Sequence, residues 1–249
     1  MEPPGYQERQ RRLAASRDEV RRLGVLSTCE VIPSRRDFAQ YVATQRTALA
    51  VIAQLAYTPG DTRATLIDYA RACDDAEVAA LAVATEPDGL SIDDMAAIAA
   101  AVTAPVLRDV LTIDPRQLYH ARLHGADAAV LPANVLDAAA LQGLVAVASS
   151  LHMASVVEVL TPADLEKALA LPHVIVGLRC ARRDGGLDLG QTHELARRVP
   201  PARTVIALPA TAPGADYEAV RGVCDAVVVG AALRTAADVA AAVLRITAA

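Results

Sequence analysis

One alternation, repeated eight times, restricts the fold of this chain more than any other feature of its sequence. From about residue 48, short apolar runs alternate with longer stretches whose apolar residues recur at helical spacing. The runs lie at 48–55, 78–85, 105–110, 127–131, 154–159, 174–178, 204–208 and 225–230, and the helical stretches at 62–73, 91–102, 115–125, 136–150, 162–170, 192–199, 216–223 and 235–246. Because the runs are continuously apolar, they are typical of strands in a sheet that is buried on both faces.

Eight strand–helix units in strict order predict an α/β protein with (β/α)8 architecture, the TIM barrel. The length of 249 residues is usual for one domain of this kind. An open, doubly wound sheet is the alternative, but no G-x-G-x-x-G motif follows the first run. The barrel is therefore favoured.

The residues before the first strand are predicted to form a helical extension over 1–46, with the barrel at 47–249, in one domain overall. Apolar residues fall on one face of a helix over 6–23, and Gly24 ends it. The helix carries six arginines: Arg9, Arg11, Arg12, Arg17, Arg21 and Arg22. Acidic residues interleave with them, which is typical of a solvated amphipathic helix. A docking surface for a protein partner is the alternative interpretation.

Charge and composition exclude several classes of protein. The formal net charge is −5, so the chain lacks the basic field of a general nucleic-acid binder, and we predict no nucleic-acid partner. Its apolar stretches are too short to span a membrane, and its charged start is not that of a signal peptide. We therefore predict no membrane association. The four cysteines form no C-x-x-C pair, which favours a reduced, cytoplasmic protein.

We expect neither a metal nor a cofactor. His120 and His124 are four residues apart, a spacing that can bind metal on a helix. However, no glutamate follows the first histidine as in H-E-x-x-H, and their helix is predicted to pack outside the barrel. A surface pair is the expected arrangement.

In a barrel of this type, chemistry takes place at the carboxyl ends of the strands. Charged residues are concentrated at those positions, chiefly Arg108, Asp109, Glu158, Arg179, Arg182, Arg183 and Arg234. Such a ring predicts a site for a small polar or anionic ligand. Ion pairs along a solvated rim would explain the same residues without a ligand.

The strand ends also resemble a known family, indole-3-glycerol phosphate synthase. The resemblance rests on PSRRDFAQ, LAVIAQ, ATEPDGLSIDDM, PVLRDVLTIDPRQLYHARLHGADAAVL, VVEVLTPADLEKAL, VIVGLRCARR and DAVVVGAAL, in the family's order and spacing from about residue 30. It implies a TIM barrel with a helical N-terminal extension. It also implies the family's reaction in tryptophan biosynthesis, which closes a ring on an anthranilate-bearing, phosphorylated, opened ribulose with decarboxylation and dehydration.

The resemblance places four catalytic groups of the family on this chain. A glutamate and a lysine at the end of the first strand correspond to Gln54 and Ala56, and a second essential glutamate corresponds to Glu158. The central lysine, the general acid of ring closure, corresponds to Asp109. Gln54 cannot accept a proton as a carboxylate does, and Asp109 should repel the substrate carboxylate. Lys167, the only lysine, is expected on an outward-facing helix.

The binding groups implied by the resemblance are also changed. Arg179 stands where the family has an asparagine, followed by Cys180, which we expect to be an inert thiol. The two phosphate loops become 208–210 and 230–232, which lack the family's hydroxyl groups, although Gly230 is kept and Arg234 is a nearby cation. The loop after the second strand lacks the family's aromatic side chains.

These departures predict a barrel without the standard reaction. The candidate catalytic residues are Glu158, Asp109 and Gln54, and the candidate substrate-binding residues are Arg108, Arg179, Arg182, Gly230 and Arg234. The barrel would then bind or transform a small anionic metabolite, or act as a non-catalytic homologue. A functional synthase, a carboxy-lyase with atypical site residues, is the alternative.

Overall fold

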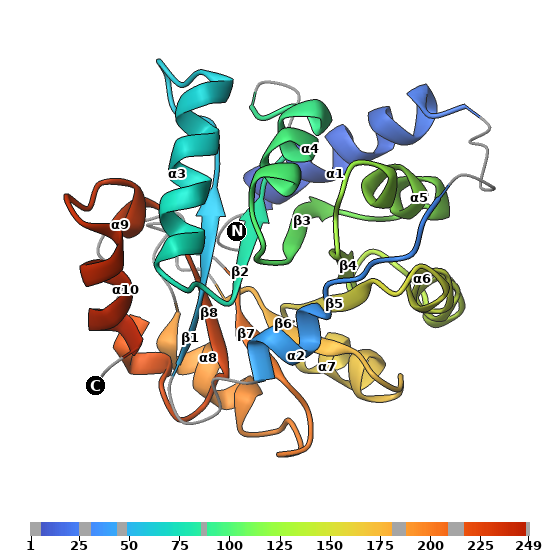
Figure 1. The fold of residues 1–249 in the computed structure, drawn as a ribbon. Helices are drawn as coiled ribbons and strands as arrows, with labels where there is room; N and C mark the ends of the chain where they lie inside the picture. The colour runs from blue at the N-terminus through green and yellow to red at the C-terminus, as the bar shows by residue number, and fades with distance from the viewer. Residues whose placement is uncertain are drawn as a thin grey trace.

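A computed structural model describes residues 6–24, 31–43, 49–85, 89–180, 188–208 and 217–247. Eight parallel strands close into a barrel, in which each strand pairs with the next along the chain and β8 pairs with β1 (Figure 1). The strands are β1 (Ala50–Leu55), β2 (Ala80–Val83), β3 (Val106–Leu111), β4 (Ala128–Pro132), β5 (Ala154–Val159), β6 (Ile175–Leu178), β7 (Val205–Ala207) and β8 (Ala226–Val229). The closed sheet confirms the predicted (β/α)8 fold, and each strand lies within or beside the run that predicted it.

Helices follow the strands and surround the barrel. They are α3 (Arg63–Asp75), α4 (Ile92–Ala101), α5 (Pro115–Leu123), α6 (Ala138–Ser150), α7 (Pro162–Leu169), α8 (Leu189–Ala196), α9 (Ala231–Arg234) and α10 (Val239–Thr247). The prediction of a helix at 216–223 was wrong in extent. The described part of this stretch contains a single 3-10 turn, η2 (Tyr217–Val220). Gly222 follows with φ of +77°, a left-handed conformation that ends the turn.

Local sequence signals place the helix starts. Thr62, Ser91, Asp114 and Thr161 each accept a hydrogen bond from a backbone N–H of the first turn, and the third residue of each helix bonds back to the cap. A cap of this kind contributes about 1 kcal/mol. The helices therefore begin at fixed positions beyond the carboxyl ends of the strands, and these positions shape the mouth of the barrel.

Small and branched apolar side chains fill the interior. Successive residues of a strand point to opposite faces, so Ile52, Val156 and Val228 point inward while their neighbours pack against the helices. Gly177 of β6 belongs to the inner layer, where a Cβ atom would lie 2.8 Å from Cγ1 of Val156. Inward positions further along β1, β3 and β5 are polar, and they form the mouth.

The segment before β1 covers both ends of the barrel. Helix α1 (Tyr6–Arg22) lies at the carboxyl ends of the strands, packed on β3 and α5, and Leu13 joins the inner core there. Helix α2 (Phe38–Ala43) lies at the opposite end, where Phe38 and Val42 join the same core (Figure 1). Two segments that are close in the sequence thus close opposite ends of the sheet.

A second polar cluster lies at the amino ends of the strands, and we call Ser34, Arg36, Arg122 and Asp127 the bottom cluster. Asp127 accepts hydrogen bonds from the hydroxyl of Ser34 at 2.6 Å and from the backbone N–H of Val106 at 2.9 Å. It also pairs with Arg36 at 2.8 Å and Arg122 at 2.7 Å. These contacts attach the N-terminal segment to the start of β4.

The predicted boundary between extension and barrel, at residues 46 and 47, lies outside the described residues. Both helices before it pack on the barrel. No helix within the described ranges is long and apolar enough to cross a membrane.

Candidate functional site at the barrel mouth

Two carboxylates point into the barrel at the carboxyl ends of β3 and β5. Asp109 and Glu158 lie on the inward-facing sides of their strands, and only 2% and 0% of their surfaces are exposed. Burying a carboxylate is costly unless positive charges and hydrogen bonds compensate. The nature of these partners therefore decides what the mouth can do.

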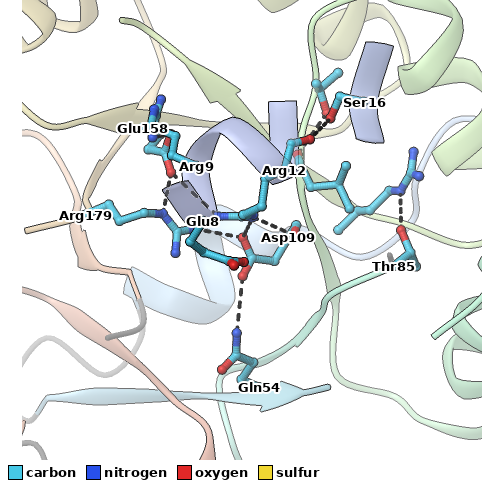
Figure 2. A network of polar contacts seen from close by, with 12 residues as sticks. Glu8, Arg9, Arg12, Ser16, Gln54, Thr85, Asp109, Glu158 and Arg179 are labelled. Carbon is cyan, nitrogen blue, oxygen red and sulfur yellow. Dashed lines mark hydrogen bonds and ion pairs between the residues drawn. The ribbon is translucent and has the colours of Figure 1, made fainter. Parts of the chain in front are cut away.

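Arginines of α1 provide part of the compensation. Nη1 of Arg9 lies 2.6 Å from Oε2 of Glu158, and Nη2 of Arg12 lies 2.7 Å from Oδ1 of Asp109 (Figure 2). Arg12 also donates to the backbone oxygen of Asp109 at 2.8 Å, and Arg9 to the side chain of Asn134. The side chains of Arg9 and Arg12 are only 13% and 11% exposed, so α1 inserts both into the mouth.

The third cation comes from the barrel itself. Arg179, directly after β6, bonds to both carboxylates: Nη2 lies 2.9 Å from Oδ1 of Asp109, and Nε donates to Oε1 of Glu158. Gln54 of β1 completes the group by donating to Oδ2 of Asp109 at 3.4 Å (Figure 2). We call these six residues the mouth cluster: Arg9, Arg12, Gln54, Asp109, Glu158 and Arg179.

These partners determine the protonation of both acids. Burial by itself raises the pKa of Asp109, but the charges of Arg12 and Arg179 and their hydrogen bonds outweigh it, so the pKa falls to about 2. Burial likewise raises the pKa of Glu158, and the charges of Arg179, Arg9 and Arg12 bring the pKa below its ordinary value. Both side chains are therefore carboxylates at neutral pH.

A separate group of residues at the rim of the barrel holds the C-terminal part of α1. We call this group the latch: Glu19, Arg108, Gln117 and His120. Glu19 accepts hydrogen bonds from Arg108 at 2.7 Å and Gln117 at 2.8 Å, and lies 3.3 Å from Nδ1 of His120. Burial raises the pKa of Glu19, but the hydrogen bond with His120 and the charge of Arg108 outweigh it, and the pKa falls to about 2. Glu19 is thus ionised and joins α1 to β3 and α5.

Comparison with known proteins places this barrel in a family. The family model described as indole-3-glycerol phosphate synthase matches residues 5–246, nearly the whole chain. The chain belongs to the indole-3-glycerol phosphate synthase family. This membership confirms the family resemblance of the strand ends.

Individual relatives are similar over part of their length. A tryptophan biosynthesis protein TrpCF of Yersinia pestis is 36% identical over 157 residues, 63% of this chain and 33% of its own length. An indole-3-glycerol phosphate synthase of Aromatoleum aromaticum is 43% identical over 108 residues, 43% of this chain and 41% of its own. Another, of Mycobacterium sp. strain KMS, is 35% identical over 176 residues, 69% of this chain and 64% of its own. The chain thus spans between 33% and 64% of these relatives' lengths.

The structure places all three predicted catalytic residues, Gln54, Asp109 and Glu158, in one hydrogen-bonded group. At the positions where the resemblance to the synthase family puts lysines, Ala56 is exposed beyond β1 and Asp109 is buried. Lys167 lies elsewhere, donating to the backbone oxygens of Ala133 at 2.7 Å and Leu136 at 3.1 Å. The one lysine of this family member is therefore not part of the mouth cluster.

The predicted binding residues separate into three groups. Arg179 belongs to the mouth cluster, and Gly230 lies beside it, where an added Cβ would be 2.6 Å from Oε1 of Gln54. Arg108 lies on the other face of β3, bonded to Thr85 and Glu19, because neighbouring strand residues point to opposite faces. Arg234 pairs with Asp61 and lies 4.7 Å from the ring centre of Tyr69. Arg182 lies outside the described residues.

Sequence reasoning missed the contribution of α1. The prediction of a solvated helix is confirmed for four arginines, which are exposed: Arg11, Arg17, Arg21 and Arg22. It is wrong for Arg9 and Arg12, whose side chains are largely buried in the mouth. The available signal was spacing: residues 9, 12, 16 and 19 recur at helical intervals and share one face, which also holds the buried Ser16 and the latch residue Glu19. The pattern was hidden because charged residues also fill the exposed face.

The remaining candidates lie in ordinary structural environments. Burial raises the pKa of the Cys180 thiol to about 11, which fits the inert thiol predicted for it. His120 and His124 contact each other edge to face at 4.6 Å, and His120 belongs to the latch instead of lying free on the surface. Within the described ranges, no group of three or more metal-ligating side chains is present.

Proposed function

We propose that this member of the indole-3-glycerol phosphate synthase family does not catalyse the family's ring closure. The observation that carries the proposal is the state of Asp109, which stands where the resemblance places the general acid. With a pKa of about 2 it holds no proton to donate at neutral pH, and as a base it is far weaker than a group with a pKa near 7.

The protonation state of Glu158, the second buried carboxylate, supports the same proposal. Glu158 is fully buried and paired with Arg9 and Arg179, and its lowered pKa also keeps it ionised. An acid–base pair normally has its two pKa values pushed apart, whereas here both are pushed down. The mouth cluster is therefore built to hold ion pairs, and proton transfer is not its role.

The test is turnover of the synthase substrate, the phosphorylated anthranilate-bearing deoxyribulose. We expect no turnover by the full chain under conditions in which a lysine-bearing relative is active. Turnover at an ordinary enzyme rate, about 1–1,000 per second, would overturn the proposal. The variant Glu158→Gln would then decide whether that activity depends on the mouth, since a loss of 100-fold or more is expected of a positioned acid or base.

Binding of a small anionic metabolite is the second candidate function. Three guanidinium groups, from Arg9, Arg12 and Arg179, meet in the mouth, and arginine is well suited to bind carboxylates and phosphates. This function requires α1 to stay docked, because two of the three groups belong to it. A screen of phosphates and carboxylates for thermal stabilisation tests it: about 2.7 kcal/mol is expected at 100 times the dissociation constant, and no shift would count against it.

Two further expectations remain proposals. A reduced, cytoplasmic location is supported by Cys73, Cys180 and Cys224, which are free thiols. A protein partner would have to use the outward face of α1, where Arg17 and Arg21 are exposed. A pull-down that recovers the same proteins after both arginines are replaced by glutamine would remove that motivation.

A further inference from the structure

The described barrel residues of the mouth cluster carry a net negative charge, and α1 brings positive charge to them. Among the described barrel residues of the mouth cluster, Asp109 and Glu158 contribute −2 and Arg179 contributes +1, so the sum is −1. Arg9 and Arg12 of α1 add +2. Within the mouth cluster, α1 therefore contributes guanidinium groups as a cationic ligand would, whereas its Glu19 meets Arg108 at the rim.

The contacts of α1 are also those of a ligand. The ends of the two arginine side chains meet the carboxylates of the mouth at 2.6 and 2.7 Å (Figure 2). The contact of Arg12 with Asp109 is a charge-assisted hydrogen bond, which is the stronger kind, and that of Arg9 with Glu158 is a close ion pair. Their acceptors are held by buried strands, so the receiving side of the contact is preformed.

The attachment of α1 can open without breaking the sheet. Each hydrogen bond described between α1 and the barrel involves at least one side chain, including the latch of Glu19 with Arg108 and Gln117. Side-chain contacts of this kind can release a segment locally while the core strands stay intact. Side-chain contacts therefore hold α1 at the mouth, together with the packing of Leu13 in the inner core.

We propose that the mouth is a guanidinium-binding site that α1 fills from within the chain, and that a small guanidinium-bearing ligand takes the place of Arg9 and Arg12 when α1 leaves. The guanidinium ion fits because its planar fork presents several donors to carboxylate oxygens. The inference rests on the proposed function, since it assigns the mouth to a cation instead of the synthase substrate. Its readout is stability, so it can fail while that proposal stands.

The first test empties the site in the full chain with the double variant Arg9→Gln, Arg12→Gln. Of the described guanidinium groups, Asp109 and Glu158 then keep that of Arg179, and we expect the melting temperature to fall by roughly 5–10 °C. The matched control is Arg17→Gln, Arg21→Gln, which removes the same charge from the exposed face of α1, and it should shift by about 1 °C or less. Equal shifts in the two variants would overturn the inference.

The second test refills the site. Methylguanidinium, at concentrations far below those that denature proteins, should restore at least half of the lost melting temperature in the double variant, with saturation. Tetramethylammonium at the same ionic strength should not, because it carries a charge but no N–H donors. Rescue by both cations, or by neither, would overturn the inference. Rescue by inorganic phosphate alone would do so too, and would favour the anionic ligand.

A third measurement covers the case in which the double variant does not fold. In the unmodified protein, methylguanidinium should speed amide hydrogen exchange in α1 at least several-fold while β3 and β5 stay protected, because the ligand competes with Arg9 and Arg12. Unchanged exchange in α1 at saturating methylguanidinium would overturn the inference.

Discussion

At each end of the barrel, a buried carboxylate pairs with an arginine from the N-terminal segment and another from the barrel, yet the two clusters are built differently. In the bottom cluster, Asp127 accepts a backbone N–H bond from Val106 and a hydroxyl bond from Ser34 in addition to its arginines. In the mouth cluster, the hydrogen bonds described for the Asp109 carboxylate all come from side chains, those of Arg12, Arg179 and Gln54.

The difference separates a structural lock from a reversible contact. The N–H of Val106 belongs to β3 and cannot move without breaking the sheet, and Arg36 also bonds to backbone oxygens of Ala99, Val102 and Ala104. Arg9 and Arg12 can leave with α1, which makes no strand pairing. Similar ion pairs therefore hold the fold at one end and close a site at the other.

The largest effect is expected at the bottom cluster. Asp127→Asn replaces a carboxylate oxygen by an amide that faces donors, leaving Arg36 and Arg122 without their counter-charge, and should lower the free energy of unfolding by about 3–5 kcal/mol. Urea unfolding measures it. The control is Asp75→Asn on the exposed end of α3, expected within about 0.5 kcal/mol of the unmodified protein. A loss at Asp127 no greater than that of the same change at Asp109 would break the comparison.

Acid should weaken the mouth end. The pKa of Asp109 falls from 3.8 to about 2 in the fold, and that of Glu19 from 4.5 to about 2. A carboxyl group with a lowered folded pKa stabilises the protein above its unfolded pKa, and this contribution is lost as pH falls toward the folded value. The free energy of unfolding should thus decline between about pH 5 and 2, by about 2 kcal/mol from Asp109.

Urea unfolding at a series of pH values measures this decline. The double variant Asp109→Asn, Glu19→Gln should show a shallower slope, whereas the exposed control Asp75→Asn should keep the original one. If the free energy of unfolding of the double variant falls with pH as steeply as that of the unmodified protein, the pKa of neither carboxyl group is lowered by folding.

The matching change in the mouth should have a smaller effect. Asp109→Asn keeps an oxygen toward Arg12 and Arg179, and Gln54 can turn its amide to meet the new NH2 group, so the loss should be about 1–2 kcal/mol. Hydrogen exchange should also speed up in α1 but not in α2. Equal acceleration in both helices would show that the two ends are not independent.

The smallest effect is expected at Gly230. In Gly230→Ala the new Cβ would lie 2.6 Å from Oε1 of Gln54, so the flexible Gln54 side chain must move, at a cost of about 1 kcal/mol or less. This cost should vanish in a Gln54→Ala background, which a double-mutant cycle measures. Gly143→Ala, in an open position on α6, should instead stabilise the protein by about 0.5–1 kcal/mol. If Gly230→Ala still destabilises the protein in the Gln54→Ala background, the new Cβ must clash with a group other than the Gln54 side chain.

The fold was predictable because its signals are local and repeated. Continuous apolar runs found all eight strands, and capping residues such as Thr62 and Thr161 mark helix starts in the sequence itself. The stretch at 216–223 failed because its apolar spacing is helical, whereas Gly222 ends the turn in a conformation that spacing does not show.

Only those site residues that lie on strands or at strand ends were predictable from the sequence. Because the carboxyl ends of the strands meet at the mouth of a barrel, the positions of Gln54, Asp109, Glu158 and Arg179 in the sequence were enough to group them. The partners of Asp109 and Glu158 could not be assigned, because Arg9 and Arg12 lie about 100 residues or more away in the sequence, on a helix whose docking direction depends on contacts such as Glu19 with Arg108.

The amino-acid order alone determined the eight-unit barrel, the charged residues at the strand ends and the absence of lysine from those ends, since these are properties of neighbouring residues. Only the tertiary structure decided that the first helix fills the mouth. That outcome depends on the free energy of burying two carboxylates, and such burial becomes favourable only when distant guanidinium groups can reach them.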